Sequence, residues 1–241
     1  GYDSFYISRY GELLNAAQNN GKFSSQIPRA DAVLPFADKY TDILSNPYRK
    51  KLLDLLGVHY IAARNDKKNN KMEKKEGIID LPLVWKDDKF NIYEYKNALP
   101  RIFLANNFIA LTDNQEILNK FFDEKTDISK TIILEEQPVN FSAGGEKVGL
   151  AQISSYTPNK IVATSTSDSN SLLFISDNYY PGWKAFVDGV ETKIYRADYT
   201  FRAIVVPKGN HVVVFKYQPK SFNIGLMLTS LGLLLSLLFC I

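Results

Sequence analysis

Alternation of apolar and polar positions between residues 172 and 219 predicts a series of short β-strands. From His211 to Tyr217 the odd-numbered residues fall on one face, and Val212, Val214 and Lys216 fall on the other. A period of two is typical of a strand with one buried face. Three turn signals separate the apolar runs, because proline presets φ and glycine accepts positive φ: Pro181-Gly182, Asp188-Gly189 and 207–210. The segment therefore predicts a β-meander that forms one side of a sandwich.

Residues 224–241, IGLMLTSLGLLLSLLFCI, form an apolar run that contains no charged residue. As a helix they would extend about 27 Å at 1.5 Å per residue, close to the thickness of a membrane's hydrocarbon core. Lys220, Tyr217 and Phe222 precede the run, where aromatic rings and lysine favour the membrane interface. We expect a transmembrane helix, in preference to a buried core helix or an amphipathic helix that docks on a partner.

The first half of the chain mixes helical and strand patterns. Helix signals surround 9–20, with Gly21 after it, 46–57, where Asn46-Pro47 resembles a helix start, and 113–122 with its D-x-x-E start. Strand patterns occupy 58–63, which reads as a buried strand, 83–85, 90–95, 101–109 and 131–135. This order predicts an α+β arrangement.

Shorter strands follow at roughly ten-residue spacing, over 149–156, 160–165 and 172–176. That rhythm is typical of a β-sandwich. The predicted fold class is α+β: an N-terminal mixed α/β part, then an all-β antiparallel sandwich of jelly-roll or immunoglobulin-like type, then a C-terminal transmembrane helix. The corresponding divisions are 1–135, 136–221 and 222–241.

Composition and charge exclude some classes of partner and an intrachain disulfide. The net charge is only +3, and basic residues are interspersed with acids, so we expect no nucleic-acid binding. The lysine-rich segment 64–76 is interpreted as a solvated loop rather than a polybasic lipid or nucleic-acid site. The single cysteine, Cys240, excludes an intrachain disulfide. Because the sequence starts at Gly1 without methionine and stops inside the apolar run, we expect a piece of a larger polypeptide.

Known catalytic and metal-binding motifs are missing from the sequence. It contains no G-x-S-x-G, Walker loop, G-x-G-x-x-G or H-E-x-x-H, and only two histidines. We predict no catalytic residue, no metal site and no cofactor in this chain. His59 is interpreted as a packed or hydrogen-bonded side chain, and His211 as a core residue whose ring nitrogen is hydrogen-bonded locally.

Aromatic and charged residues gather near the predicted turns. Aromatic rings can cover the apolar faces of sugars while charged groups bind hydroxyls. The alternative, which we favour for the cluster as a whole, is that the rings fill the sandwich core and the charges pair across strands. Trp183, Tyr195 and Asp198 belong to the cluster, and Trp183 is expected in the core. The candidate glycan-binding or polymer-binding residues are Tyr179, Tyr180, Asp188, Arg196, Tyr199 and Arg202.

Several motifs in one order resemble a known family. They are GYDSFYISRYGELLN at 1–15, LLDLLGVHYI at 52–61, YEYKNALPRIFL at 93–104, and the run from Asn178 to Gly225 that begins NYYPGWKAFVDG. Together they resemble bacterial YfhO-type polytopic membrane proteins of the GT-C class. The resemblance spans nearly the whole chain.

The resemblance implies an extracytoplasmic domain that lies between transmembrane helices of a glycosyltransferase at the cell membrane. Such proteins are similar to enzymes that move a sugar from a polyprenyl-phosphate carrier to a cell-envelope polymer such as lipoteichoic acid. The implied partners are membrane lipid and either a cell-envelope glycopolymer or a polyprenyl-linked sugar. The acid that activates the acceptor lies in an early loop in this class, outside the chain. The alternative is a non-catalytic carbohydrate-binding or structural ectodomain of a transporter or flippase.

Overall fold

The structure is a computed structural model of residues 1–241, in which residues 7–24, 46–64, 81–141 and 149–239 are described. It is α+β with mostly antiparallel strands, as predicted. The lysine-rich segment from residue 65 onward, Cys240 and much of the predicted loop 23–42 lie outside the described residues.

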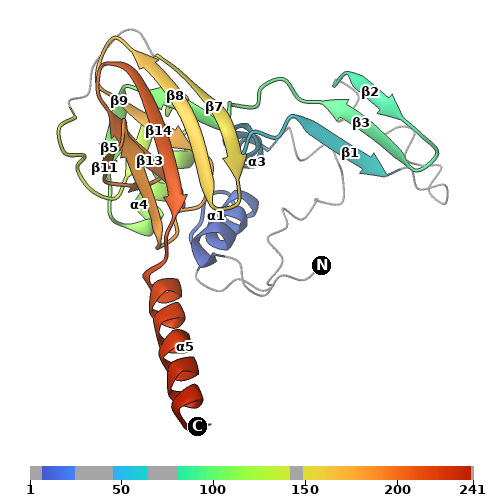
Figure 1. The fold of residues 1–241 in the computed structure, drawn as a ribbon. Helices are drawn as coiled ribbons and strands as arrows, with labels where there is room; N and C mark the ends of the chain where they lie inside the picture. The colour runs from blue at the N-terminus through green and yellow to red at the C-terminus, as the bar shows by residue number, and fades with distance from the viewer. Residues whose placement is uncertain (1–6, 25–45, 65–80, 142–148, 240–241) are drawn as a thin grey trace.

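Two sheets form the body of the molecule (Figure 1). The five-stranded sheet has the order β11-β10-β14-β8-β7, and every pair in it is antiparallel. Its strands are β7 (Leu150–Thr157), β8 (Lys160–Ser167), β10 (Trp183–Val187), β11 (Val190–Thr192) and β14 (Gly209–Tyr217).

The six-stranded sheet has the order β4-β9-β13-β12-β6-β5. Its strands are β4 (Ile102–Ala105), β5 (Asn107–Ala110), β6 (Thr131–Leu134), β9 (Ser171–Ile175), β12 (Tyr195–Ala197) and β13 (Phe201–Val206). Only β5 and β6 pair in parallel, and a helix between them makes the crossover that a parallel pair needs. The range 101–109, predicted as one strand, is two.

The interior between the two sheets is apolar. Side chains from both sheets meet there, and most are fully buried, so the sheets form a sandwich. This cluster contains Ile102, Leu104, Ile161, Ala163, Leu173, Ile175, Ala185, Val187, Ile204, Val206, Val213 and Phe215. The burial of Val213 and Phe215 agrees with the alternation predicted for this strand.

Helices cover the outer face of the six-stranded sheet. They are α1 (Ser8–Gln18), α3 (Pro47–Leu55) and α4 (Asn114–Phe122), and their apolar faces share a cluster with β6, β9 and β13. All three match predicted helices. Asn46 caps α3 by accepting from the N–H groups of Tyr48 and Arg49, and Asp113 caps α4 by accepting from Glu116. Because helices cover one face and a sheet the other, β9 is buried at every residue.

The predicted meander is wrong in its connections. The chain after β9 alternates between sheets: β10, β11 and β14 join the five-stranded sheet, and β12 and β13 join the six-stranded sheet. The turn at 207–210 therefore carries the chain from one sheet to the other instead of closing a hairpin. Turn chemistry specifies a reversal, but the partner of each strand is decided by which apolar face it can bury.

Residue 135, the predicted end of a mixed α+β part, lies inside this arrangement. Strands β4, β5 and β6 precede it, and they share one sheet with β9, β12 and β13, which follow it. The sandwich is thus built from both halves of the chain, and its first strand begins at Ile102.

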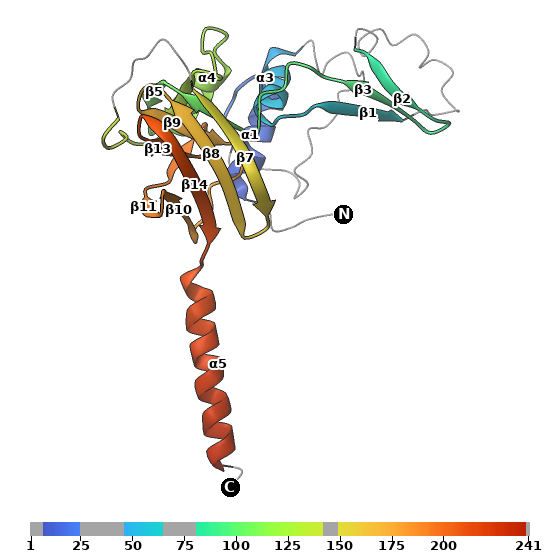
Figure 2. The ribbon, with the colours of Figure 1, turned by 45° about the horizontal axis from the view of Figure 1, so that its top comes forward.

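A small three-stranded sheet extends away from the sandwich (Figure 2). It has the order β1-β3-β2, with β1 (Tyr60–Arg64), β2 (Leu83–Lys86) and β3 (Phe90–Glu94). The prediction that the first of these strands is buried is wrong. Tyr60 is 61% exposed while Ile61 is 8% exposed, because this sheet has only one partly covered face.

Helix α5 (Lys220–Phe239) leaves the end of β14 and projects from the body (Figures 1 and 2). Its large apolar side chains between 222 and 235 are about half exposed or more. Among the described residues, no helix meets the length and apolarity needed to cross a membrane. The predicted transmembrane helix is therefore not supported by the described structure.

Candidate functional site

An open cleft of about 710 Å³ lies at the end of the sandwich from which α5 departs. The ends of β7, β9, β10 and β14 meet there, together with the start of α1 and the loop after α3. The lining comprises Ile7, Tyr10, Leu56, Val58, Arg101, Tyr156, Pro158, Asn159, Ser176, Asp177, Asn178, Tyr180, Trp183, Phe201, Arg202 and Tyr217.

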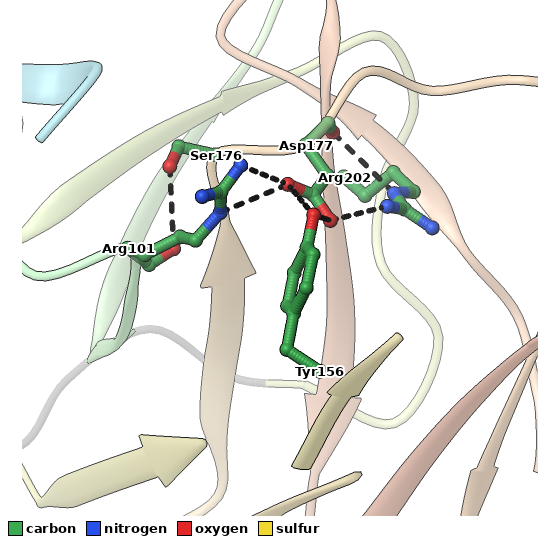
Figure 3. A network of polar contacts seen from close by, with 5 residues as sticks. All are labelled: Arg101, Tyr156, Ser176, Asp177 and Arg202. Carbon is green, nitrogen blue, oxygen red and sulfur yellow. Dashed lines mark hydrogen bonds and ion pairs between the residues drawn. The ribbon is translucent and has the colours of Figure 1, made fainter. Parts of the chain in front are cut away.

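Asp177, just after β9, is the centre of a polar network in this cleft (Figure 3). Its Oδ1 accepts from Nε of Arg101 at 3.1 Å, and its Oδ2 accepts from Nη2 of Arg202 at 2.9 Å. The hydroxyl of Tyr156 donates to the same carboxylate, at 3.0 Å to Oδ2. One carboxylate therefore connects side chains from the start of β4, from β7 and from β13.

Arg202 is a buried cation. Only 2% of its side chain is exposed, and its Cζ lies 4.3 Å from the centroid of the Trp183 ring and 5.5 Å from that of Phe215. Burial lowers the pKa of Arg202, while Asp177 opposes that change. Its Nη1 is buried and has no hydrogen-bond partner among the described residues. Figure 3 shows that part of the guanidinium directed away from Asp177.

Arg101 is the accessible cation of the network. Its side chain is 55% exposed, and its guanidinium lies over the Tyr156 ring with Cζ 4.8 Å from the centroid. Burial, followed by the nearby charge of Asp177, raises the pKa of Tyr156. The phenol is therefore protonated at neutral pH and acts as a donor to Asp177.

The electrostatic balance of the lining is positive. Arg101, Asp177 and Arg202 are its charged residues, so two guanidinium groups face one carboxylate. A cleft lined by an excess of positive charge and by aromatic rings suits an anionic ligand that carries an apolar or sugar-like face.

Two of the six candidate binding residues line this cleft: Tyr180, which is 50% exposed, and Arg202. Tyr179 and Arg196 lie together at a neighbouring surface, with Cζ of Arg196 4.8 Å from the Tyr179 ring centroid. Nε of Arg196 is also 3.9 Å from a carboxylate oxygen of Glu135. A glycan-binding role for these residues stays a prediction.

The other two candidates lie elsewhere. Tyr199 is 1% exposed in the core beneath the helices, where its hydroxyl donates to Glu12 and its ring lies 4.3 Å from Cζ of Arg9. Asp188 belongs to the β10–β11 turn, where Oδ1 accepts from the N–H of Val212 at 2.8 Å and Oδ2 lies 2.6 Å from Nδ1 of His211.

The two histidines differ in their surroundings. His211 has both ring nitrogens in local hydrogen bonds, to Asp188 and to the carbonyl of Lys208, as expected. Its prediction as a core residue is wrong, because it lies near the start of β14 with 16% of its side chain exposed. His59 is exposed, so its prediction as a packed side chain is wrong. It precedes β1 of the small sheet, which covers little surface.

Sequence reasoning missed the centre of the cleft. Arg101, Tyr156 and Asp177 were not candidates, because each comes from a different strand end and no local spacing links them. Trp183, expected in the core, does pack against the sandwich interior, but it also lines the cleft beside Arg202.

Part of the chain matches a family model. Residues 146–229 match the family model described as bacterial membrane protein YfhO, a range that runs from before β7 into α5. No curated protein and no solved structure matches the chain. The three upstream motifs lie outside the matched residues, and their part in the resemblance stays a prediction. The family's description supports membrane association. Residues 146–229 are therefore similar to bacterial membrane protein YfhO, which confirms the resemblance for the part of the chain that contains the motif beginning at Asn178.

Proposed function

We propose that this chain is the extracytoplasmic domain of a multi-spanning membrane glycosyltransferase of YfhO type. The whole protein would transfer a sugar from a polyprenyl-phosphate carrier to a cell-envelope polymer such as lipoteichoic acid. The described domain would receive the acceptor in its cleft, and the bond-making residues would belong to other parts of the protein.

The position of the cleft beside α5 carries the proposal. Tyr217 lines the cleft and ends β14, and α5 begins at Lys220. Exposure of the apolar side chains of α5 to water is unfavourable in free energy, whereas contact with lipid would be favourable. If the apolar run 224–241 enters the bilayer, the cleft lies at the membrane surface, where a lipid-linked donor and a membrane-attached polymer could both reach it.

The membrane part is tested by flotation of the full chain with liposomes. The chain should float with the vesicles and resist extraction by high salt and carbonate. A Leu231→Lys/Leu234→Lys variant, which puts two charges into α5, should remain at the bottom of the gradient. Equal flotation of both proteins would contradict insertion through α5.

The side of the membrane on which the domain lies, and sugar transfer by the whole protein, are tested in the cells that make the protein. Protease added to intact cells should cleave the described domain, and loss of the protein should reduce sugar on a surface polymer. If the domain resists protease in intact cells and is cleaved only after lysis, an extracytoplasmic position is contradicted.

The second candidate is a non-catalytic carbohydrate-binding or structural ectodomain of a transporter or flippase. The aromatic lining of the cleft favours it, because Tyr180, Trp183 and Tyr217 could stack on a sugar without any reaction. Normal glycosylation of every surface polymer in cells lacking the protein, together with glycan binding by the purified chain, would favour this candidate.

A further inference from the structure

We propose that the cleft binds a phosphate group that is attached to a sugar or polyol, with Arg101 and Arg202 as its cationic ligands. The inference rests on the proposed function in treating the cleft as the acceptor site. It goes further by assigning the chemical group that the site recognises and the residues that hold it.

The net positive charge of the cleft lining is the first observation that supports this proposal. Asp177 is shared between Arg101 and Arg202, so it neutralises one guanidinium and leaves one positive charge in excess. A phosphate, which presents several strong acceptor oxygens, would neutralise that excess and accept from planar guanidinium groups.

Free donors on these arginines are the second step. Nε and Nη2 of Arg101 are directed to Asp177, and no contact with a described residue engages its Nη1. Nη1 of Arg202 is buried without a hydrogen-bond partner among the described residues. An unpaired buried N–H of a cation is costly, and a ligand oxygen is one way to satisfy it.

Trp183 lies between the Arg202 guanidinium and the other aromatic side chains of the cleft. Its ring lies against the Arg202 guanidinium and lines the cleft beside Tyr180 and Tyr217. Because Nη1 of Arg202 is buried, the proposal requires the side chains around it to move when a phosphate oxygen binds. The rings would then contact the C–H face of an attached sugar or polyol, so neither inorganic phosphate nor a neutral sugar would use the whole site.

Fluorescence can follow binding directly. Trp183 is one of two tryptophans, and the other, Trp85, is 47% exposed on β2. In a Trp85→Phe background the emission comes from Trp183 alone. The full chain in detergent micelles should show a saturable change in emission with glycerol 3-phosphate, and little change with glycerol at the same concentration.

Matched variants identify the ligands of the phosphate. Arg101→Gln should weaken binding of glycerol 3-phosphate about tenfold or more, and Arg101→Lys should bind with intermediate affinity. Lys130→Gln removes a similarly exposed charge, 63% exposed and paired with Asp127 away from the cleft, and should bind as the parent does. Unchanged emission and far-UV circular dichroism without ligand would show that the variants are folded.

Two sources of the phosphate are distinguished by a second arm. The chain in nanodiscs of phosphatidylglycerol is compared with the chain in nanodiscs of phosphatidylcholine. A phosphatidylglycerol-specific change lost in Arg101→Gln, without a response to glycerol 3-phosphate, would assign the site to a lipid headgroup. A response to glycerol 3-phosphate would assign it to a soluble or polymer phosphate.

The proposal is overturned if no saturable change occurs in either arm, if glycerol is as effective as its phosphate, or if Arg101→Gln and Lys130→Gln behave alike. Failure of the proposed function would appear separately, in the flotation and cell experiments, which do not depend on this site.

Discussion

Nη2 of Arg202 donates to Oδ2 of Asp177 at 2.9 Å, within a pair of which the arginine is almost fully buried. The pair joins the end of β9 to β13 at the edge of the cleft. A buried cation depends on its carboxylate partner because burial has removed the water that would otherwise solvate its charge.

Loss of the Asp177 carboxylate is expected to destabilise the folded state strongly. Asp177→Ala should lower the free energy of unfolding by about 3–5 kcal/mol, because it leaves Arg202 buried without its carboxylate. Glu191→Ala is the matched control: it breaks an ion pair with Lys184 at the same 2.9 Å, but both partners are exposed, so the loss should be within about 1 kcal/mol. Urea unfolding monitored by circular dichroism measures both. Equal losses would contradict the assignment of Asp177 as the support of Arg202.

Asp198 is expected to make stability depend on pH. It is fully buried, and burial raises its pKa to about 7, although the N–H of Ile133, which donates to Oδ1 at 2.9 Å, opposes the shift. In the unfolded chain the carboxyl titrates near its ordinary value of about 3.9. Between these values the folded state binds more protons, so this group's contribution to stability falls as pH rises from about 4 to 7.

Asp198→Asn tests that contribution. The amide oxygen can still accept from Ile133, while the titration is removed, so unfolding free energies of the variant should decline less than those of the parent between pH 4.5 and 7.5. Asp127→Asn serves as control, because the pKa of the more exposed Asp127 is lowered by its hydrogen bond with Ser129 and changes stability only at lower pH. Parallel pH profiles for parent and Asp198→Asn would refute the assignment.

The Asp188–His211 pair should be visible in an NMR titration. The hydrogen bond with Asp188 raises the pKa of His211, so its contribution is present below about 6.5 and is lost as pH rises through the pKa in the folded state. Asp188→Asn should lower the imidazole pKa and speed hydrogen exchange of the Val212 amide, which donates to Asp188. An unshifted His211 would mean that the pair is absent in solution.

Tyr199→Phe distinguishes a structural role from a binding role. Loss of the hydroxyl that donates to Glu12 should cost about 1–3 kcal/mol of stability. Affinity for glycerol 3-phosphate should stay the same, because Tyr199 does not line the cleft. Tyr60→Phe, at a 61% exposed tyrosine, should change stability by about 0.5 kcal/mol or less. Weakened binding by a fully folded Tyr199→Phe protein would return Tyr199 to the binding site.

Local signals in the sequence determined the elements of this protein. The Asn46-Pro47 and Asp113 helix starts, the alternation around Val213 and the turn at Asp188-Gly189 all predict structure correctly, because capping, pleating and positive φ involve only neighbouring residues. Asp188 and Gly189 have φ of +50° and +85°, as a two-residue hairpin turn requires.

Only the tertiary structure decided which strands share a sheet and where the cleft lies. β13 and β14 are consecutive, yet they belong to different sheets. β13 is buried on both faces, between the helices and the other sheet, whereas β14 buries only the face that carries Val213 and Phe215. Arg101, Tyr156 and Asp177 meet through strand ends far apart in sequence, and a lone arginine, tyrosine or aspartate carries no local signal of its partners. Arg202, one of several candidate binding residues in the sequence, is shown only by the fold to be a buried cation paired with Asp177 in the cleft.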